Sequence, residues 1–465
     1  MLLLLCSLAQ AGGLDLIEVA GPWGSPGMGG PAAVWFNPAG LAYEEGTQIT
    51  IEVAPASGYV TVDRDDPYNG GLDVLAGGGV VPFGGFSTDL GVEGLGVGLA
   101  VFAPYGRSGG STMDEGPASY AVRSGSITNV YVAPGVAFRT GGLTVGGAVH
   151  GIGSFYQAST NKEVLTALDD ELCDQGQCGL YDDSQLEDAD YSARIDLDLR
   201  GISASFTVGV ALAANEFVSV GGSYVHGAKI TNNGLATLNF GCPPDDDIYG
   251  RFGSQLTGIC DTEIPAITQV RYSLPHRIVG FLRITPTGDA DQLSIEGFGG
   301  YSMWSNYSSV EITTRVDPNG VALNREEDRE ATANLLGQDL SMARGLVDTY
   351  WVAADIRGRV SDEWTIGTRL TYDRHAIPTQ MISPNNFDTD TVVTAVLAEV
   401  KLSDSVSLAG SYSHYFQQTR VVDNSAYRVT LDNDNQAPDG FRLPQMNGTY
   451  NGSIDRGGVA LRVKL

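Results

Sequence analysis

Basic residues are scarce in this 465-residue chain: 27 Lys and Arg stand against 55 Asp and Glu, for a formal net charge of −28. Binding to nucleic acid requires clustered Lys and Arg that neutralise phosphates, so we exclude that class and expect no nucleic-acid partner. All charged residues together make up only 18% of the chain, and hydrophobic residues make up 42%. A disordered chain shows the opposite balance, so we expect a folded protein.

Long apolar runs are missing as well. After residue 11 no stretch reaches the roughly 18 apolar residues that a transmembrane helix requires, and the sequence predicts none. Residues 1–11 read MLLLLCSLAQA. A short apolar run that ends in a small-x-small pattern indicates a secretory signal peptide. Its usual basic start is absent, which indicates a truncated signal; an apolar N-terminal strand is the alternative.

Cysteine is also rare. Of the five cysteines, Cys6 lies in the expected signal peptide, which leaves Cys173, Cys178, Cys242 and Cys260. An even count in an exported chain predicts disulfides. Three pairings are open, and proximity in the sequence favours Cys173–Cys178 and Cys242–Cys260. A zinc site is the alternative, but CxxC spacing and nearby histidines are lacking. We expect neither a metal nor a cofactor.

Glycine, in contrast, is abundant, with 61 residues, and many segments alternate apolar with polar residues. In residues 459–465, Val or Leu occupies every second position, and Ala, Arg and Lys lie between them. A period of two is typical of strands with one apolar face. We count fourteen such segments, near residues 47–62, 74–86, 95–105, 118–138, 143–156, 193–213, 217–231, 266–285, 292–316, 346–360, 364–376, 389–402, 406–420 and 454–465.

The connections between these segments alternate between short and long. Short turns at one end and long loops at the other are typical of outer-membrane barrels. We therefore predict an all-β fold over residues 46–465, a transmembrane antiparallel β-barrel of about fourteen strands. The long connections are expected to be extracellular loops near residues 157–192, 232–265, 317–345 and 421–453.

Residues 12–45 do not fit the strand pattern. They are rich in Gly, Pro and Ala and show little alternation. Glycine and proline suit a segment that turns tightly in a confined space. We expect these residues to form an N-terminal plug (hatch) inside the lumen of the barrel.

Trp35, Phe36, Asn37, Pro38 and Ala39 begin the stretch WFNPAGL. This stretch resembles the NPA-containing plug segment of the FadL-type outer-membrane transporters of long-chain fatty acids and aromatic hydrocarbons. Four more stretches resemble motifs of that family in the same order along the chain: APYG at 103–106, LP at 274–275, WS at 304–305 and NGTY at 447–450. The five stretches are spread over nearly the whole mature chain.

The resemblance implies transport of hydrophobic compounds by passive diffusion through a plugged fourteen-stranded barrel. Substrate would be captured between the third and fourth long loops, pass to an inner pocket as the plug shifts, and leave sideways at the third strand. Pro104, Tyr105 and Gly106 would then form the lateral gate. Proline lacks the N–H that a ladder needs and glycine weakens a strand, which favours this interpretation. A strand that simply ends at a turn is the alternative.

Two of the long loops carry apolar residues suited to capture of such a substrate. A small core that only holds the loops together is the alternative. The four remaining cysteines lie in the same loops, where disulfides would brace them. The candidate capture residues are Leu165, Leu168, Leu172, Leu235, Leu238, Phe240 and Phe252.

These two loops are strongly acidic. Residues 157–192 contain ten acidic residues and one basic residue, and residues 232–265 contain five and one. Such a field disfavours a carboxylate substrate and mildly favours a neutral hydrocarbon. Carboxylates could also bind divalent cations that bridge lipopolysaccharide phosphates, and a solvated surface is the alternative. We expect outer-membrane lipid and lipopolysaccharide around the barrel, and a monomer.

Enzymatic readings find little support. Residues 106–110 match G-x-S-x-G, but a nucleophile elbow needs a helix directly after it, and the sequence there predicts none. We therefore expect no enzyme. The main alternative function is a structural or adhesive barrel that binds a surface partner through its acidic loops. An open porin is a further alternative, which residues 12–45 argue against by occupying the lumen.

Overall fold

The computed structural model describes residues 18–66, 70–113, 116–119, 121–163, 192–240, 262–290, 292–307, 309–321, 325–327, 329–330, 333, 337, 339–426 and 446–465. The expected signal peptide, residues 12–17 of the expected plug and the four loop cysteines lie outside the described residues.

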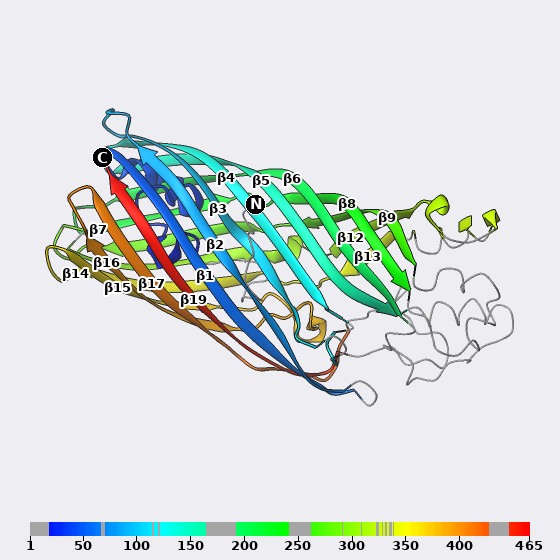
Figure 1. Ribbon diagram of the computed structural model, residues 1–465. Helices are drawn as coiled ribbons and strands as arrows, with labels where there is room; N and C mark the ends of the chain where they lie inside the picture. The colour runs from blue at the N-terminus through cyan, green and yellow to red at the C-terminus, as the bar shows by residue number, and fades with distance from the viewer. Residues whose placement is uncertain are drawn as a thin grey trace.

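A single antiparallel sheet closes on itself as a barrel (Figure 1). Five positions in the barrel are each built from two successive strands, so nineteen strands fill fourteen positions, as predicted. These pairs are β7 with β8, β9 with β10, β11 with β12, β13 with β14 and β17 with β18.

The strands are β1 (Thr47–Arg64), β2 (Gly71–Thr88), β3 (Leu95–Ser111), β4 (Ser124–Thr140), β5 (Leu143–Glu163), β6 (Ser192–Ala213), β7 (Val218–Val225), β8 (Lys229–Phe240), β9 (Glu263–Ser273), β10 (His276–Ile284), β11 (Leu293–Met303), β12 (Ser309–Val316), β13 (Asp339–Ala343), β14 (Thr349–Arg359), β15 (Trp364–Asp373), β16 (Thr391–Lys401), β17 (Val406–Gln417), β18 (Arg420–Val422) and β19 (Gly448–Lys464). The short helices are η1 (Gly21–Trp23), α1 (Ala33–Phe36), η2 (Pro38–Ala42), η6 (Trp304–Asn306), η7 (Pro318–Gly320) and η8 (Thr379–Met381). Among the described residues no helix is both long and apolar enough to cross a membrane.

The barrel closes between its first and last strands. Val53 of β1 lies opposite Val459 of β19 on one side and opposite Pro82 of β2 on the other. Closure matters because an open sheet edge would leave backbone N–H and C=O groups without partners in lipid.

The two faces of each strand carry different side chains, as β6 shows. Ile202, Val208 and Leu212 point outward and are 88%, 48% and 46% exposed, whereas Thr207 and Ala211 point into the lumen and are buried. An outward apolar row and an inward row of small or polar residues is the pattern of a barrel in lipid. The alternation in the sequence therefore reports the two sides of the barrel wall.

The strands extend further than the alternation indicates. β5 continues to Glu163, β8 continues to Phe240 and β19 already begins at Gly448, so parts of the segments expected as loops are paired strands. Residues 317–345 likewise contain β13. Beyond the lipid both faces of a strand can be polar, so the hydrophobic period disappears while the backbone ladder persists.

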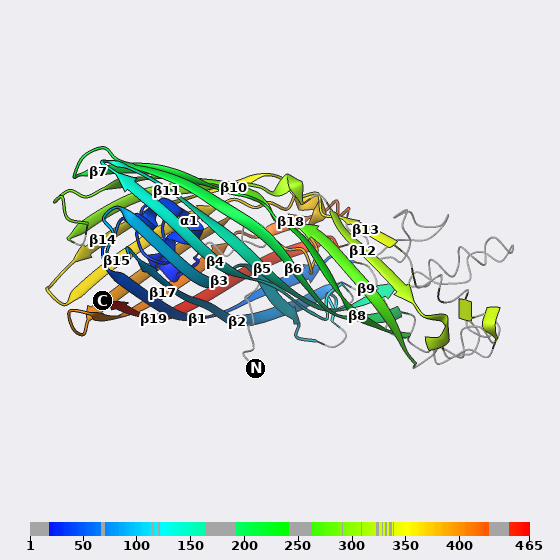
Figure 2. The ribbon, with the colours of Figure 1, turned by 90° about the horizontal axis from the view of Figure 1, so that it is seen from above.

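The described part of the N-terminal segment, residues 18–45, lies inside the barrel. Figure 2 shows α1 surrounded by strands. Val34, Trp35 and Leu41 are almost completely buried against the inner wall, and η2 packs on β3, β4, β5 and β6. The largest buried apolar cluster joins this segment to the inward faces of the strands.

Candidate functional site

Charged and polar groups of the barrel hold the first part of the N-terminal segment. The Glu18 carboxylate accepts hydrogen bonds from Arg456 at 3.0 Å and from the Tyr415 hydroxyl at 3.1 Å. Arg456 also pairs with Glu52 at 3.2 Å. Further along, the Glu296 carboxylate accepts from Ser25 and from the Gly27 N–H, both at 3.0 Å.

Asn37 joins α1 to η2. Its side-chain oxygen accepts a hydrogen bond from the Ala39 N–H at 3.2 Å, and its side-chain nitrogen donates to the Val210 carbonyl of β6 at 3.3 Å. Pro38 occupies the first position of η2, where the missing N–H costs nothing. The NPA stretch is therefore a capped helix start that also attaches the segment to the barrel wall.

Two wall glycines allow this close approach. A Cβ atom at Gly209 would lie 1.9 Å from the Asn37 side-chain oxygen, and one at Gly146 would lie 2.5 Å from the Pro38 carbonyl carbon. Any other residue at these positions would have to displace the segment. The abundance of glycine on the inner wall thus has a steric reason here.

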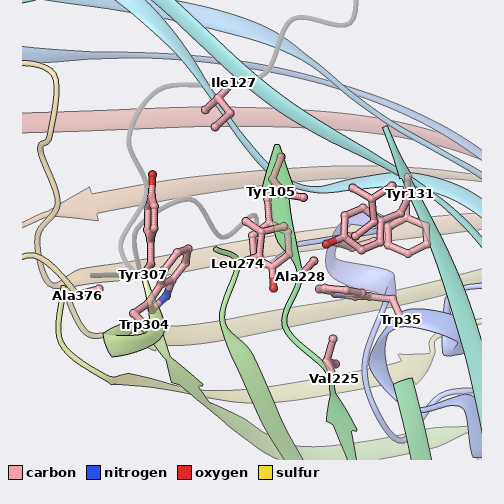
Figure 3. Close-up of a cluster of buried hydrophobic side chains, with 14 of the residues drawn as sticks. Trp35, Tyr105, Ile127, Tyr131, Val225, Ala228, Leu274, Trp304, Tyr307 and Ala376 are labelled. Carbon is pink, nitrogen blue, oxygen red and sulfur yellow. The ribbon is translucent and has the colours of Figure 1, made fainter. Parts of the chain in front are cut away.

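Trp35 is the centre of an aromatic cluster (Figure 3). Its ring centroid lies 5.6 Å from Phe102, 5.8 Å from Tyr105, 5.6 Å from Tyr131 and 5.9 Å from His150. Phe102 and Tyr105 belong to β3, so the predicted plug residue Trp35 packs directly on the strand with the predicted gate.

The pairing of β3 with both neighbours is irregular around Pro104. The ladder to β2 runs as far as Phe102 opposite Phe83 and resumes only at Gly110 opposite Ala76. The ladder to β4 slips between Phe102 and Tyr105. Residues 102–106 are all buried, so the in-and-out alternation of β3 also stops there. The structure thus brings the three predicted gate residues to a defect in the wall.

β2 contributes to the same defect. Residues 77–79 are three successive glycines and Pro82 follows shortly after, within the interval that lacks ladder partners on β3. One side-chain hydrogen bond crosses the interval, from the Ser108 hydroxyl to the Gly78 carbonyl at 3.0 Å. These β2 residues are not among the predicted gate residues, although GGG and Pro within one expected strand are a signal for weak pairing.

From the defect, a chain of rings leads toward the long-loop end. Tyr105 lies 6.3 Å from Trp304, which lies 6.0 Å from Tyr307, and Tyr307 lies 5.7 Å from Tyr272. The connection between β15 and β16, residues 374–390, folds inward and adds Phe387 and other fully buried residues to the same apolar cluster. The apolar interior is therefore continuous from Trp35 to this connection.

One positively charged spot lies beside this apolar interior. Arg107 of β3 and Arg344, which precedes β14, interact electrostatically with each other and with Tyr156 and Tyr307. Burial raises the pKa of the Tyr307 hydroxyl to about 12, although the two guanidinium groups oppose the shift. Asp388 is also close enough to interact with Arg107. Two neighbouring arginines in so acidic a chain favour an anionic group between them.

The structure separates the predicted capture residues that it describes. Leu235 is 65% exposed on the outer face of β8, whereas Leu238 is buried on the inner face. Phe240 ends β8. The two leucines therefore cannot line one groove. The other capture residues, Leu165, Leu168, Leu172 and Phe252, lie outside the described residues.

Comparisons with solved structures show the same fold. A Pseudomonas aeruginosa FadL homologue is 15% identical, with a TM-score of 0.76 over 97% of this chain and 99% of that chain. The Pseudomonas putida toluene transporter TodX is 12% identical, with a TM-score of 0.65 over 99% and 100% of the chains. The Ralstonia pickettii toluene transporter TbuX is 14% identical, with a TM-score of 0.61 over 94% of each chain.

A comparison with curated protein sequences finds no match. The sequence model of the family described as outer membrane protein transport protein (OMPP1/FadL/TodX) matches residues 5–441, nearly the whole chain. Members of this family are outer-membrane channels for hydrophobic compounds and are not enzymes. A β-barrel fold alone would fit many proteins. Here the family match covers nearly the whole chain and agrees with the fold: this chain belongs to the FadL/TodX family of outer-membrane transporters.

Proposed function

We propose that this barrel takes up hydrophobic molecules by passive diffusion and releases them sideways into the membrane at the β2–β3 defect. The observation that carries the proposal is the contact of Trp35 with Phe102 and Tyr105. It places the N-terminal segment against the stretch of β3 that lacks ladder partners on β2. A movement of the segment would therefore first change the packing at the defect.

Lateral release suits the energetics of an apolar substrate. Burial of each CH₂ group stabilises such a molecule by about 0.8 kcal/mol, so a long chain should not cross open water on its way inward. The apolar interior that joins Trp35 to Trp304 and Phe387 offers a path without such a step. An exit through the wall leads directly into lipid.

Within this function we infer that N-terminal residues 18–45 act as the plug. The segment fills part of the lumen and is attached to β6 through Asn37. Deletion of residues 37–39 would remove this attachment and the start of η2. We expect such a barrel to fold but to lose controlled passage, which would appear as ion conductance in planar bilayers.

For the substrate we favour a long-chain fatty acid over a neutral hydrocarbon. Arg107 and Arg344 would bind its carboxylate while the chain lies along the aromatic interior. Aromatic hydrocarbons are the alternative, because two proteins with similar structures are toluene transporters. The two classes differ in charge, so the arginines allow them to be distinguished.

The test measures uptake by a Gram-negative host that lacks its own transporter and displays this barrel. Labelled long-chain fatty acid and labelled toluene are supplied to wild type, to Pro82→Ala/Pro104→Ala and to Arg107→Gln/Arg344→Gln. The first variant restores two backbone N–H groups, so the ladder can close. Pro134→Ala is the matched control, since Pro134 lies opposite Leu99 in the regular part of the β3–β4 ladder, away from the β2–β3 defect. Heat-modifiable gel migration confirms folding.

We expect the double proline variant to reduce uptake of both compounds while Pro134→Ala does not. The double arginine variant should reduce uptake of the fatty acid alone. Unchanged uptake by the proline variant would refute lateral release, and equal effects on both compounds would refute the role of the arginines. A folded wild-type barrel that takes up neither compound would favour the adhesive alternative.

A further inference from the structure

The outer face of β6 changes from apolar to basic along its length. Toward the long-loop end, the exposed side chains of Phe206 and Ile202 are followed by Arg200. The side chain of Arg200 is 72% exposed and makes a loose contact of 3.9 Å with the exposed side chain of Asp198. Arg200 thus stands directly above the apolar band that faces lipid.

The next two barrel positions repeat this order. On β7 and β8, outward Tyr224 and His226 are followed by exposed Lys229. On β10 and β9, Ile278 and His276 are followed by exposed Arg271. On all three neighbouring positions the outward face therefore passes from apolar or aromatic residues to a basic residue.

The cross-strand register places these basic residues on adjoining strands. Arg271 lies opposite Thr231, two residues along from Lys229, and Asn233 lies opposite Arg200. The Ser203 hydroxyl of β6 donates to the Lys229 carbonyl at 2.7 Å, which joins β6 to β8 at this level. We name Arg200, Lys229 and Arg271 the outer basic patch.

Glu311 and two histidines are the other ionisable neighbours. Glu311 of β12 lies opposite Arg271. His226 and His276 lie just below the patch with ring centroids 4.6 Å apart, and the Tyr224 hydroxyl contacts both of their Nδ1 atoms, at 3.2 Å and 2.7 Å. The polar belt below the patch is thus engaged in its own hydrogen bonds, whereas the three basic side chains extend outward.

Over β14 to β19 the corresponding belt is of mixed charge. Asp348, Asp390 and Asp455 each accept a hydrogen bond from a tyrosine hydroxyl, of Tyr301, Tyr372 and Tyr412 respectively. Exposed Arg374 lies over the Tyr350 ring in the same belt. A basic sector is unexpected from composition alone, since the whole chain has a net charge of −28.

We propose that the outer basic patch binds a phosphate group of outer-leaflet lipopolysaccharide. The continuous apolar rows on the outer faces of β6, β7 and β10 end at the patch, which is the level of lipid headgroups, and the outward side chains of Leu235 and Ile267 lie further toward the long loops. Arginine and lysine form charge-assisted hydrogen bonds with phosphate oxygens. The proposal differs from cation-bridged binding by acidic residues, because it needs no divalent ion.

The experiment uses the full-length barrel in detergent and measures binding of diphosphoryl and monophosphoryl lipid A, with and without EDTA. The test variant is Arg200→Gln/Lys229→Gln/Arg271→Gln. The control, Arg139→Gln/Arg359→Gln/Lys401→Gln, removes three exposed basic residues near the short-turn end. Gel migration before and after heating confirms that each barrel is folded.

We expect the test variant, which lacks all three basic side chains, to bind diphosphoryl lipid A at least about tenfold more weakly, since loss of even one charge-assisted contact is of this order. Wild-type binding should persist in EDTA, be weaker for the monophosphoryl form and remain unchanged in the control variant. Equal affinity of wild type and test variant would overturn the proposal. Abolition of wild-type binding by EDTA would do so as well, because it would assign binding to cations held by acidic residues.

Discussion

Two segments fold into the barrel from opposite ends, and they are held in different ways. Residues 18–45 join β1 at the short-turn end, and their Glu18 is paired with Arg456, midway along β19, inside a network that includes Glu52. Residues 374–390 enter at the long-loop end, where the buried carboxylate of Asp388 accepts hydrogen bonds from the Ala376 and Ile377 N–H groups.

The carboxylates of Glu18 and Asp388 differ in how the nearby arginine contacts them. Arg456 donates directly to the Glu18 carboxylate. Arg420, in contrast, donates to the carbonyl oxygens of Asp388 and Ile377 and to the Thr379 hydroxyl. Burial consequently raises the pKa of the Asp388 carboxyl to about 7, with the backbone N–H groups and Arg420 opposing the shift only in part. The N-terminal segment is thus fixed by a buried ion pair, whereas the outer segment carries a carboxyl group that titrates near neutral pH.

Arg456→Met tests whether the buried ion pair anchors the N-terminal segment, and it is expected to have the largest effect. The substitution leaves Glu18 and Glu52 as buried carboxylates without their cation, which should lower the free energy of unfolding by about 3–5 kcal/mol. Urea unfolding of the refolded barrel measures this value. Arg139→Met, an exposed position on β4, should change it by less than about 0.5 kcal/mol. A small effect of Arg456→Met would show that the ion pair does not anchor the segment.

Trp35→Leu tests the apolar part of the N-terminal segment. Trp35 makes four aromatic contacts, so the loss of ring area and ring pairs should cost about 2–3 kcal/mol. Native-state hydrogen exchange should report faster exchange in α1 than in the wild type. Val393→Ala, a buried change in a cluster that contains no residue of the described N-terminal segment, controls for general loss of packing. Equal exchange in α1 for both variants would contradict a specific role of Trp35.

The outer segment should respond to pH through Asp388. The pKa of Asp388 is higher in the folded protein than in an open segment, so the folded segment binds the extra proton and its stability falls as pH rises toward about 7. The opening constant should increase by up to about tenfold per pH unit between about 4 and 7. Hydrogen exchange at Ala376 and Ile377, corrected for the intrinsic rate, measures this. Asp388→Asn should abolish the dependence, and persistence of it would assign the effect to another group.

The sequence predicted the barrel and a segment in its lumen, but not the contacts that the lumen contains. Alternation reports which strand face meets lipid, and an outward residue such as Ile202 or Leu212 needs no tertiary information to be recognised. The proximity of Arg107 to Arg344 depends on segments far apart in the chain, and periodicity contains no signal for it. The inward fold of residues 374–390 is equally invisible, because their sequence resembles any polar connection.

The spacing of Leu235 and Leu238 could have corrected the expectation that both belong to one capture groove. Leu235 and Leu238 are an odd number of positions apart, and residues with that spacing lie on opposite faces of one strand. The expected loop boundary concealed this, since no parity rule applies to a loop. The plug motif was more informative: residues 35–39 do lie in the lumen, although the sequence could not show that Asn37 reaches β6 or that Trp35 reaches β3.

The smallest expected effect concerns the junction within the N-terminal segment. Asn37→Ala removes the cap of η2 and the hydrogen bond to Val210, and should lower stability by about 1 kcal/mol. Asn37→Asp keeps the cap but not the donor to Val210, so the difference between the two variants separates the two contacts. Because the cap directly follows the aromatic part, urea unfolding of Asn37→Ala/Trp35→Leu also tests the coupling between Asn37 and the ring contacts of Trp35. Additive losses would mean that the cap and the ring contacts act independently; a combined loss smaller than the sum would mean that they depend on each other.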